Sequence, residues 1–347
     1  MMKICLVGDF KKPRDMGERN LAYNLAKVLS LSNSVMTLRP KDILDSKSII
    51  RLREYGPDVM HYLTGPRTRS FIVLSILKWI ARCRITVMSA PRPVIPDTHL
   101  RFLKFIKPDM VLSQSTEHLK IFLNYGFNAK FLPNGVDMGK FRPVDENHKK
   151  ALREKYNVPQ NRYVVLHTGY ISKRRGIEAL VRLAQERDLF IIVVGATSWI
   201  NPDISLVDRL NKVGCRVILK YLPTIEELYQ LSDSYVFPGR GATTGKKSQF
   251  QGRNQSPSIE IPLSVLEALA CNLPAVSRKF GGLEEMFPRN SGIFFADSDQ
   301  QILDTIKALK SSSVQQNSYQ LIENYTWEKI AGRIEHIYTR LLDTRNR

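Results

Sequence analysis

The chain of 347 residues is long enough for two domains, each with its own hydrophobic core. Hydrophobic residues make up 43% of it, which excludes an intrinsically disordered chain. The four cysteines lie far apart without ligand spacing, so we expect a reducing compartment, no metal site and no bound cofactor. The N-terminal apolar run is too short for a signal peptide, so the sequence predicts a cytoplasmic protein.

A net charge of +19 dominates the composition and is unevenly distributed. Residues 1–150 contain 26 Lys and Arg against 13 Asp and Glu, and the remainder contain 26 against 20. This excess predicts a polyanionic partner, either nucleic acid, an anionic membrane surface or a phosphorylated substrate. Three cations interrupt the most apolar window, Ser70–Met88, so we expect no membrane-spanning helix.

Apolar runs and helical patterns alternate along the first half, which is typical of a parallel α/β sheet. The first run, Lys3–Gly8, is followed by a loop and then by a helix with Leu21, Leu25 and Leu29 on one face. We expect strands at 3–8, 35–38, 58–63, 85–88, 110–113 and 129–132, and helices at 18–30 and 115–125.

The pattern restarts after a polar segment, Val144–Asn161, which is typical of a linker containing one helix. Two doubly wound Rossmann-like domains facing a cleft follow from this repetition, with ligands at the carboxyl ends of the strands. Strands are expected at 163–168, 190–194, 217–219, 234–237, 273–276 and 292–295. Helices are expected at 177–186, 225–232, 263–270, 300–311 and 327–342, and a further helix is expected to start within 281–285. The aperiodic stretch 239–258 predicts a mobile loop near the functional site.

The stretch Ser258–Val276 combines a helix start with an acid in an apolar sequence. Pro262 precedes the helix, Glu267 lies one turn inside it, and Asn272 favours its end. Free N–H groups at a helix N-terminus suit a phosphate, and a carboxylate can accept hydrogen bonds from two ribose hydroxyls. A surface helix with one solvated Glu is the alternative.

Four segments resemble motifs of the family 4 glycosyltransferases, which have the GT-B fold. FLPNGVDMGKFRP at 131–143 matches the Asn-Gly-Val-Asp motif, and GYISKRRG at 169–176 matches a glycine–basic–glycine loop. Residues 259–276 match the segment ending Val-Leu-Glu-Ala-x-Ala-x-x-x-Pro-x-Val, and 325–342 match a closing helix that crosses back to the first domain. The resemblance implies an acceptor-side domain over 1–145, a linker over 146–161, a nucleotide-sugar domain over 162–324 and the closing helix over 325–347.

In this family a sugar moves from a nucleotide-diphosphate donor to an acceptor with retention, usually without a metal. The resemblance implies that Glu267 binds the ribose, and that Leu263 and Ser264 offer N–H groups to the phosphate or sugar. Gly17 would let the backbone approach the donor closely. The expected donor-site residues of the basic loop are Tyr170, Lys173, Arg174 and Arg175.

The chain also departs from the family pattern. Ile259 stands where the first of two glutamates is expected, Tyr170 where an arginine is expected, and Met88 where a histidine is expected. Pro262 replaces a glycine and removes an N–H donor. We expect Glu260, one position late, to reach into the cleft as the functional carboxylate, while Ile259 packs against the core. A catalytically weakened protein that binds a nucleotide sugar as a partner subunit is an alternative.

Several basic residues of the first domain predict an anionic or lipid-linked acceptor, although a solvated surface would have the same composition. Membrane or nucleic-acid binding by the same fold is a further alternative. A nucleic-acid reader is the weaker of these, because aromatic residues are not interleaved with the basic ones. The candidate acceptor-side residues are Lys11, Lys12, Arg14, Arg92 and His99.

Overall fold

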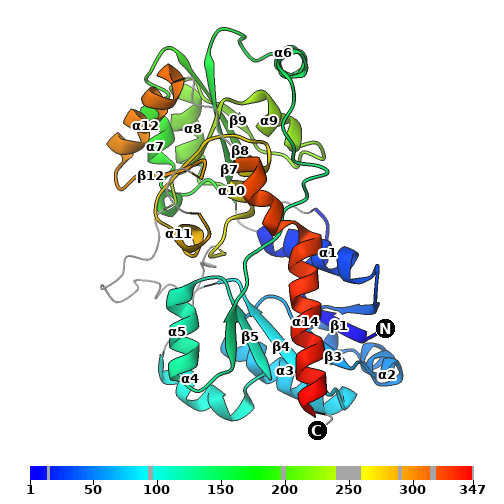
Figure 1. Ribbon diagram of the computed structural model, residues 1–347. Helices are drawn as coiled ribbons and strands as arrows, with labels where there is room; N and C mark the ends of the chain where they lie inside the picture. Colours follow the sequence, from blue (N-terminus) through cyan, green and yellow to red (C-terminus); the bar gives the residue numbers. More distant parts are fainter. Residues whose placement is uncertain are drawn as a thin grey trace. The chain divides into compact units, whose positions relative to one another are not determined.

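The computed structural model describes residues 1–13, 16–92, 97–196, 201–239, 259–287, 291–312 and 318–345. The stretch expected to form a mobile loop, 239–258, lies outside these ranges except for Gly239. The chain divides into two compact units (Figure 1). The first unit contains Met1–Gly135, residues 259–261 and the C-terminal helix, and the second contains most of 136–326. Within the described ranges, no helix is both long and apolar enough to cross a membrane.

The first unit is built on a six-stranded parallel sheet with the order β2-β1-β3-β4-β5-β6. The order reverses between β1 and β3, which is the switch point of a doubly wound fold. Its strands are β1 (Lys3–Val7), β2 (Ser34–Leu38), β3 (Val59–Tyr62), β4 (Ile85–Ala90), β5 (Met110–Ser113) and β6 (Ala129–Phe131).

Helices cover this sheet, and three of them were not expected from the sequence. The sequence indicated α1 and α5 but not α2, α3 or α4. In α3 the periodicity is hidden, because apolar side chains occupy both the buried and the outward face. The helices are α1 (Gly17–Leu29), α2 (Ser46–Tyr55), α3 (Thr68–Ala81), α4 (Asp97–Leu103), α5 (Thr116–Asn124) and α14 (Trp327–Arg345), with 3-10 turns η1 (Asp42–Leu44) and η2 (Lys104–Ile106).

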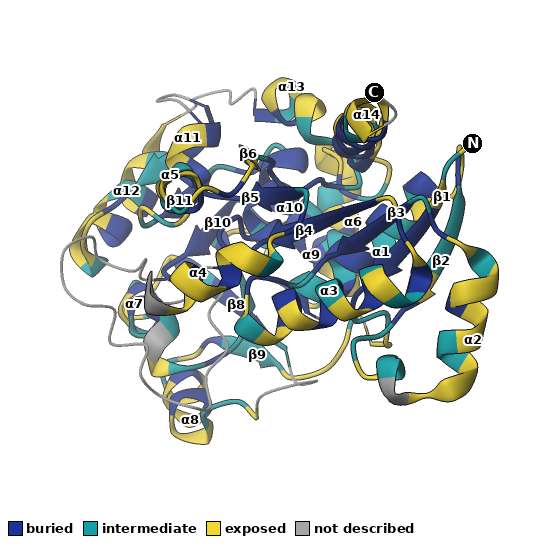
Figure 2. Cartoon of the chain, turned by 90° about the horizontal axis from the view of Figure 1, so that it is seen from below, coloured by how far each residue is buried: buried dark blue, intermediate teal, exposed yellow. Residues whose placement is uncertain are grey.

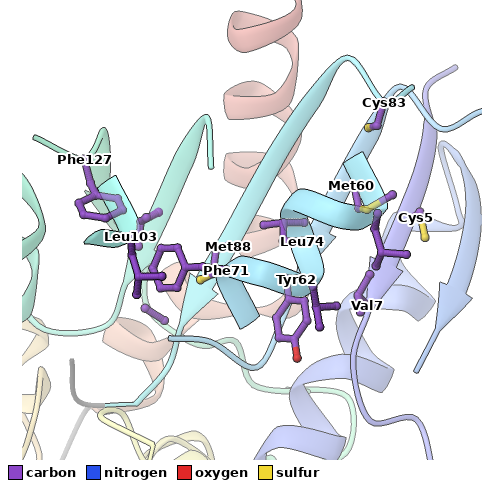
Figure 3. Close-up of a cluster of buried hydrophobic side chains, with 14 of the residues drawn as sticks. Cys5, Val7, Met60, Tyr62, Phe71, Leu74, Cys83, Met88, Leu103 and Phe127 are labelled. Atoms are coloured by element: carbon purple, nitrogen blue, oxygen red, sulfur yellow. The ribbon is translucent and has the colours of Figure 1, made fainter. Parts of the chain in front are cut away.

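The core of the first unit lies between the sheet and α3, α4 and α5 (Figure 3). Phe127 meets the edges of Phe71 and Phe122 with ring centroids 5.7 Å and 5.6 Å away. Burial raises the pKa of the Cys5 and Cys83 thiols to about 12, so both stay protonated at neutral pH. All four cysteines are free and buried.

The second unit repeats the architecture with a parallel sheet in the order β12-β11-β10-β7-β8-β9. Its switch point lies between β7 and β10. Across both sheets, every strand expected from the sequence is present, with ends that differ by at most two residues. The strands are β7 (Tyr163–Gly169), β8 (Leu189–Gly195), β9 (Arg216–Ile218), β10 (Ser234–Phe237), β11 (Ala275–Ser277) and β12 (Ile293–Phe295).

The helices of the second unit include two that the sequence did not indicate, α8 and α13. The predicted end of α10 at Asn272 is confirmed. Asn272 has a left-handed φ of 56°, and its N–H donates a hydrogen bond to Leu269 O at 3.0 Å. The helices are α6 (Glu146–Lys155), α7 (Glu178–Leu183), α8 (Ile204–Lys212), α9 (Glu226–Leu231), α10 (Leu263–Ala270), α11 (Leu283–Met286), α12 (Asp299–Ser311) and α13 (Ser318–Ile322), with 3-10 turns η3 (Lys173–Arg175) and η4 (Glu323–Tyr325).

The segment 146–161, expected as a linker, lies inside the second unit. Its helix α6 packs on α9, and both Lys149 and Arg153 pair with Asp233 at 2.7 Å. Asp233 also accepts the N–H of Val164 at 2.6 Å, so it anchors the helix to the start of β7. The polar composition of 146–161 therefore belongs to a docked helix, and the chain passes between the units after Gly135.

The C-terminal helix α14 belongs to the first unit, as the sequence predicts (Figure 1). It packs on α1, and the hydroxyl of Tyr338 lies 2.5 Å from Nδ1 of His61 on β3. The other ring nitrogen of His61 lies 2.8 Å from Oγ of Ser89. Burial lowers the pKa of His61 to about 3, so this imidazole is neutral and serves to attach the helix to the sheet.

Tyr338→Phe should lower the free energy of unfolding by about 1–3 kcal/mol, because it leaves a ring nitrogen of His61 buried without its partner. Urea unfolding measures the change. Tyr221→Phe is the matched control, since Tyr221 is 44% exposed and should change stability by less than about 0.5 kcal/mol. Equal effects of the two substitutions would mean that the His61 contact does not hold α14 in place.

Candidate functional site

A group of polar side chains lies at the switch point of the second sheet, where parallel sheets of this kind bind ligands. We name this group the switch-point site. It is formed by the end of β7, the following loop Gly169–Gly176, β10, and the first two turns of α10. All of its members belong to the second unit.

Glu267 on α10 is the central acid of the switch-point site. Its carboxylate accepts a hydrogen bond from the hydroxyl of Tyr229 at 2.8 Å. Oγ1 of Thr168, at the end of β7, lies 2.8 Å from the same hydroxyl. The hydroxyl of Tyr235 on β10 donates to Thr168 O at 3.3 Å. One network therefore links two strands and two helices to this carboxylate.

The environment of Glu267 disfavours its charge. Burial raises the pKa of its carboxyl to about 7, and this outweighs the hydrogen bond from Tyr229 and the attraction of Lys140, both of which lower it. Among the described residues, Tyr229 is its only hydrogen-bond donor, so most of its oxygen lone pairs are available to a ligand. An acid poised near neutrality with open acceptor positions is typical of a binding site.

Aromatic packing holds Tyr229 in place. Tyr229 is fully buried and stacks on Tyr235 with ring centroids 5.7 Å apart. Phe141 meets its ring edge at 5.4 Å. This contact explains the Phe-x-Pro end of the motif at 131–143, because Phe141 supports the hydroxyl that binds Glu267. Sequence reasoning missed Tyr229, Tyr235 and Thr168, since nothing local marks them as partners of a residue on another element.

The loop after β7 depends on its last glycine. Gly176 has a left-handed φ of 68°, and a Cβ at this position would lie 2.2 Å from Pro238 O. No other residue fits without moving the backbone. The loop therefore lies against the end of β10. The close approach to Pro238 explains why the glycine–basic–glycine motif ends in glycine.

Arg175 is the basic residue of this loop that the structure brings into the switch-point site. Its guanidinium lies over the ring of Tyr170, 5.6 Å from the centroid, and burial lowers its pKa. Within the described part of the chain, no carboxylate pairs with it. A desolvated cation without a counter-ion is costly, which makes this position receptive to an anion. Lys173 is exposed, and the side chain of Arg174 lies outside the described residues.

The N-terminus of α10 adds donors to the switch-point site. Pro262 is the N-cap residue in extended geometry with φ −63° and ψ 122°, and no side chain caps the helix. In the ranges that the structure describes, the N–H groups of Leu263 and Ser264 make no hydrogen bond. Together with the helix dipole, they favour an anionic ligand.

Glu260 belongs to the first unit, whereas Glu267 on α10 belongs to the second. It is 6% exposed, its N–H donates to Pro91 O at 2.7 Å, and one carboxylate oxygen lies 3.5 Å from Nδ1 of His118 on α5. The next residue, Ile261, accepts a hydrogen bond from Asn134 at 2.8 Å. Sequence reasoning missed His118, because its partner is more than a hundred residues away.

Two further departures from the family pattern have a clear location. Met88 is fully buried in the core of the first unit, where its thioether packs among apolar side chains (Figure 3). Ile259, which the sequence predicts to pack against the core, is partly buried.

The structure describes four of the five acceptor-side residues predicted in the first unit. Arg92 is 8% exposed and makes an ion pair with Glu18. Burial raises the pKa of the Glu18 carboxyl, and the nearby charge of Arg92 only partly opposes this rise. Gly17, beside Glu18, is the first residue of α1. His99 is exposed, with Nδ1 2.9 Å from Oγ1 of Thr68. Lys11 and Lys12 are exposed, and Arg14 lies outside the described residues.

No group of three His, Cys, Asp or Glu side chains suited to a metal ion occurs in the described residues. Arg175 and the backbone N–H groups at the start of α10 contribute positive charge to the switch-point site, and Lys140 attracts the carboxylate of Glu267.

Glu267→Gln should stabilise the protein at pH 8 by on the order of 1–3 kcal/mol relative to the unsubstituted chain. The folded-state pKa of about 7 exceeds the usual 4.5, so the contribution of Glu267 to stability is greatest below pH 4.5 and is lost as the pH rises through 7. The difference in the free energy of unfolding between Glu267→Gln and the unsubstituted chain should nearly vanish at pH 5. Urea unfolding at pH 5 and pH 8 measures it. Glu328→Gln is the control, because Glu328 is exposed. If the stability difference between Glu267→Gln and the unsubstituted chain does not change with pH, the raised pKa of Glu267 is contradicted.

Comparisons with known proteins agree with this fold. The family of glycosyl transferases group 1 matches residues 148–329, which is more than half of the chain. The structure of Anabaena HepE in complex with UDP-glucose aligns over 98% of this chain and 100% of its own, with a TM-score of 0.74 and 18% identity. At this identity the similarity confirms the fold alone.

Two curated relatives match this chain over shorter stretches. D-inositol 3-phosphate glycosyltransferase 2 of Catenulispora acidiphila is 23% identical over 60% of this chain and 50% of its own length. Alpha-galactosylglucosyldiacylglycerol synthase of Streptococcus pneumoniae is 23% identical over 43% of this chain and 37% of its own. The chain thus matches half or less of these relatives. With the family match and the GT-B fold together, the chain belongs to the group 1 glycosyl transferases, the family 4 enzymes that its motifs resemble.

Proposed function

We propose that this protein transfers a sugar from a nucleoside-diphosphate donor to an acceptor, with retention of configuration and without a metal ion. The observation that supports this most is the combination of Glu267 and Arg175 at one switch point. A carboxylate with open lone pairs is complementary to the two hydroxyls of a ribose. A partly buried guanidinium that no described carboxylate pairs with is complementary to a diphosphate.

The proposed donor contacts use residues of the second unit. Glu267 accepts hydrogen bonds from the ribose hydroxyls, while Arg175, with Lys173 and Arg174 beside it, neutralises the diphosphate. The N–H groups of Leu263 and Ser264 bind phosphate or sugar oxygens. Tyr170 orients Arg175 through its ring. From the first unit, Gly17 offers a backbone that the donor can approach closely.

Charge stabilisation is the proposed source of catalysis. When the bond between sugar and diphosphate breaks, negative charge moves to the departing phosphate oxygen. Arg175 and the N-terminus of α10 are fixed before the reaction, and partial burial strengthens their effect. This arrangement supplies the positive charge that a metal ion would otherwise provide.

Glu260 is the proposed catalytic carboxylate. Burial, the bond from its N–H to Pro91 O and the neighbouring imidazole of His118 restrict its position. A carboxylate with fixed orientation beside the donor sugar would stabilise positive charge that develops on the sugar ring. Its one-residue offset from the family pattern follows from the extended geometry that Pro262 favours for the residue before it.

The proposed acceptor is anionic or lipid-linked. This inference draws on the excess of basic residues in the first half and on relatives whose names include an inositol phosphate or a diacylglycerol product. Lys11, Lys12 and His99 are exposed and free to contact such an acceptor, whereas the charge of Arg92 is offset by Glu18.

The direct test is incubation with a panel of nucleoside-diphosphate sugars, with and without EDTA, and with inositol phosphate and diacylglycerol acceptors. We expect transfer in the presence of EDTA and an anomeric configuration, read by NMR, that equals that of the donor. Donor binding without transfer or hydrolysis, observed by thermal shift across the panel, would instead indicate a partner subunit that only binds the nucleotide sugar.

Glu260→Gln should lower the transfer rate by about 10²-fold or more and leave nucleotide affinity nearly unchanged, because it removes a charge while keeping the shape. Initial rates and thermal shifts with the donor measure the two effects. Glu117→Gln is the control, since Glu117 is exposed on the same helix as His118. If transfer by Glu260→Gln equals that of the control, Glu260 has no part in catalysis.

A further inference from the structure

Large apolar side chains are exposed together on one part of the first unit. Helix α3 contacts both α4 and the 3-10 turn η2 that follows α4 (Figure 2). Exposed residues lie on the outer faces of these elements. We name this group the apolar patch, and it consists of Ile72 (45% exposed), Ile76 (43%), Trp79 (79%), Phe102 (75%) and Phe105 (79%).

The fold of the first unit does not account for the apolar patch. Ile72, Ile76 and Trp79 follow the spacing i, i+4, i+7 and so lie on one face of α3. The opposite face already fills the core with Phe71 and Leu74. A helix that is apolar on both faces is normally buried on both. Single exposed apolar residues need no explanation, but five of them on adjoining elements indicate an interaction surface.

Exposed cations lie on or next to the elements that form the apolar patch. Between residues 59 and 108 the sequence contains nine Lys and Arg and a single acid, Asp97. Lys104 Nζ lies 5.3 Å from the ring centroid of Phe105, which places a cation directly beside an exposed aromatic. The exposed cations on or next to these elements are Arg69, Arg82, Arg101, Lys104 and Lys107.

We propose that the apolar patch docks on the surface of an anionic lipid bilayer. Aromatic rings and branched aliphatic side chains enter the boundary between head groups and acyl chains, where Trp is favoured. The long side chains of Lys and Arg can extend past buried apolar surface to reach lipid phosphates. This inference gives the lipid-linked acceptor of the proposed function a route to the enzyme, but the docking itself does not require transfer.

A second copy of the chain is a poorer occupant of the same surface. In a two-fold dimer the same patch of both chains meets itself, so the cations around it would face each other. Like charges placed together oppose association, whereas anionic lipid is attracted by them.

Vesicle flotation tests the docking. We expect the protein to float with vesicles of phosphatidylcholine and phosphatidylglycerol, and at least tenfold less with pure phosphatidylcholine or in high salt. The double variant Trp79→Ser with Phe105→Ser should lose at least tenfold in binding, as should Arg101→Gln with Lys104→Gln. Ile204→Ser is the control, because Ile204 is 60% exposed and belongs to the second unit. This variant should bind vesicles as the unsubstituted protein does.

Several outcomes would overturn the proposal. These are no flotation, equal flotation with neutral vesicles, or unchanged flotation of the Trp79 and Phe105 variant. A concentration-dependent dimer that this variant abolishes would assign the face to a second copy. Donor binding is measured by thermal shift in the same proteins. This measurement separates the docking proposal from the proposed transfer function. If the unsubstituted protein binds the donor but does not float, the docking alone is refuted. If it floats but does not bind the donor, the proposed function alone is refuted.

Discussion

The hydrogen bond from Tyr229 to Glu267 is the interaction on which the candidate site depends. It holds a partly buried carboxylate with one donor among the described residues, while burial raises the pKa of that carboxyl to about 7. Tyr229 can do this because Phe141 and Tyr235 pack on its ring and Thr168 contacts its hydroxyl. Residues from a loop, two strands and two helices therefore serve to fix one acid.

The electrostatics of the switch-point site are complementary to the proposed donor. Arg175 lacks a carboxylate partner in the described residues, and burial disfavours the charge of Glu267. Tyr235 on β10 lies within electrostatic range of both Arg175 and Glu267, so the two groups share one neighbour. A ligand with hydroxyls at one end and phosphates at the other would donate hydrogen bonds to Glu267 and pair with the charge of Arg175. A nucleoside diphosphate has this form.

Much of the fold could be predicted because buried parallel strands are short apolar runs bounded by turn residues. Motifs located Glu267 and Arg175, but local sequence contains no signal for Tyr229 or His118, whose roles come from contacts across the fold. Helix α3 was missed because it is apolar on both faces. The sequence predicts a linker with one helix over 146–161, because nothing in the local sequence shows that the cations Lys149 and Arg153 pair with Asp233, some eighty residues away.

The central claim, that Glu267 binds the ribose of a nucleoside diphosphate, is tested most directly by calorimetric titration of such a nucleotide and of its 2′,3′-dideoxy analogue. The unsubstituted protein should bind the analogue about 1–3 kcal/mol more weakly, and Glu267→Ala should bind both equally. This coupling would assign the ribose hydroxyls to that carboxylate. If Glu267→Ala still prefers the hydroxylated nucleotide by the same margin, the ribose lies elsewhere and the assignment is wrong.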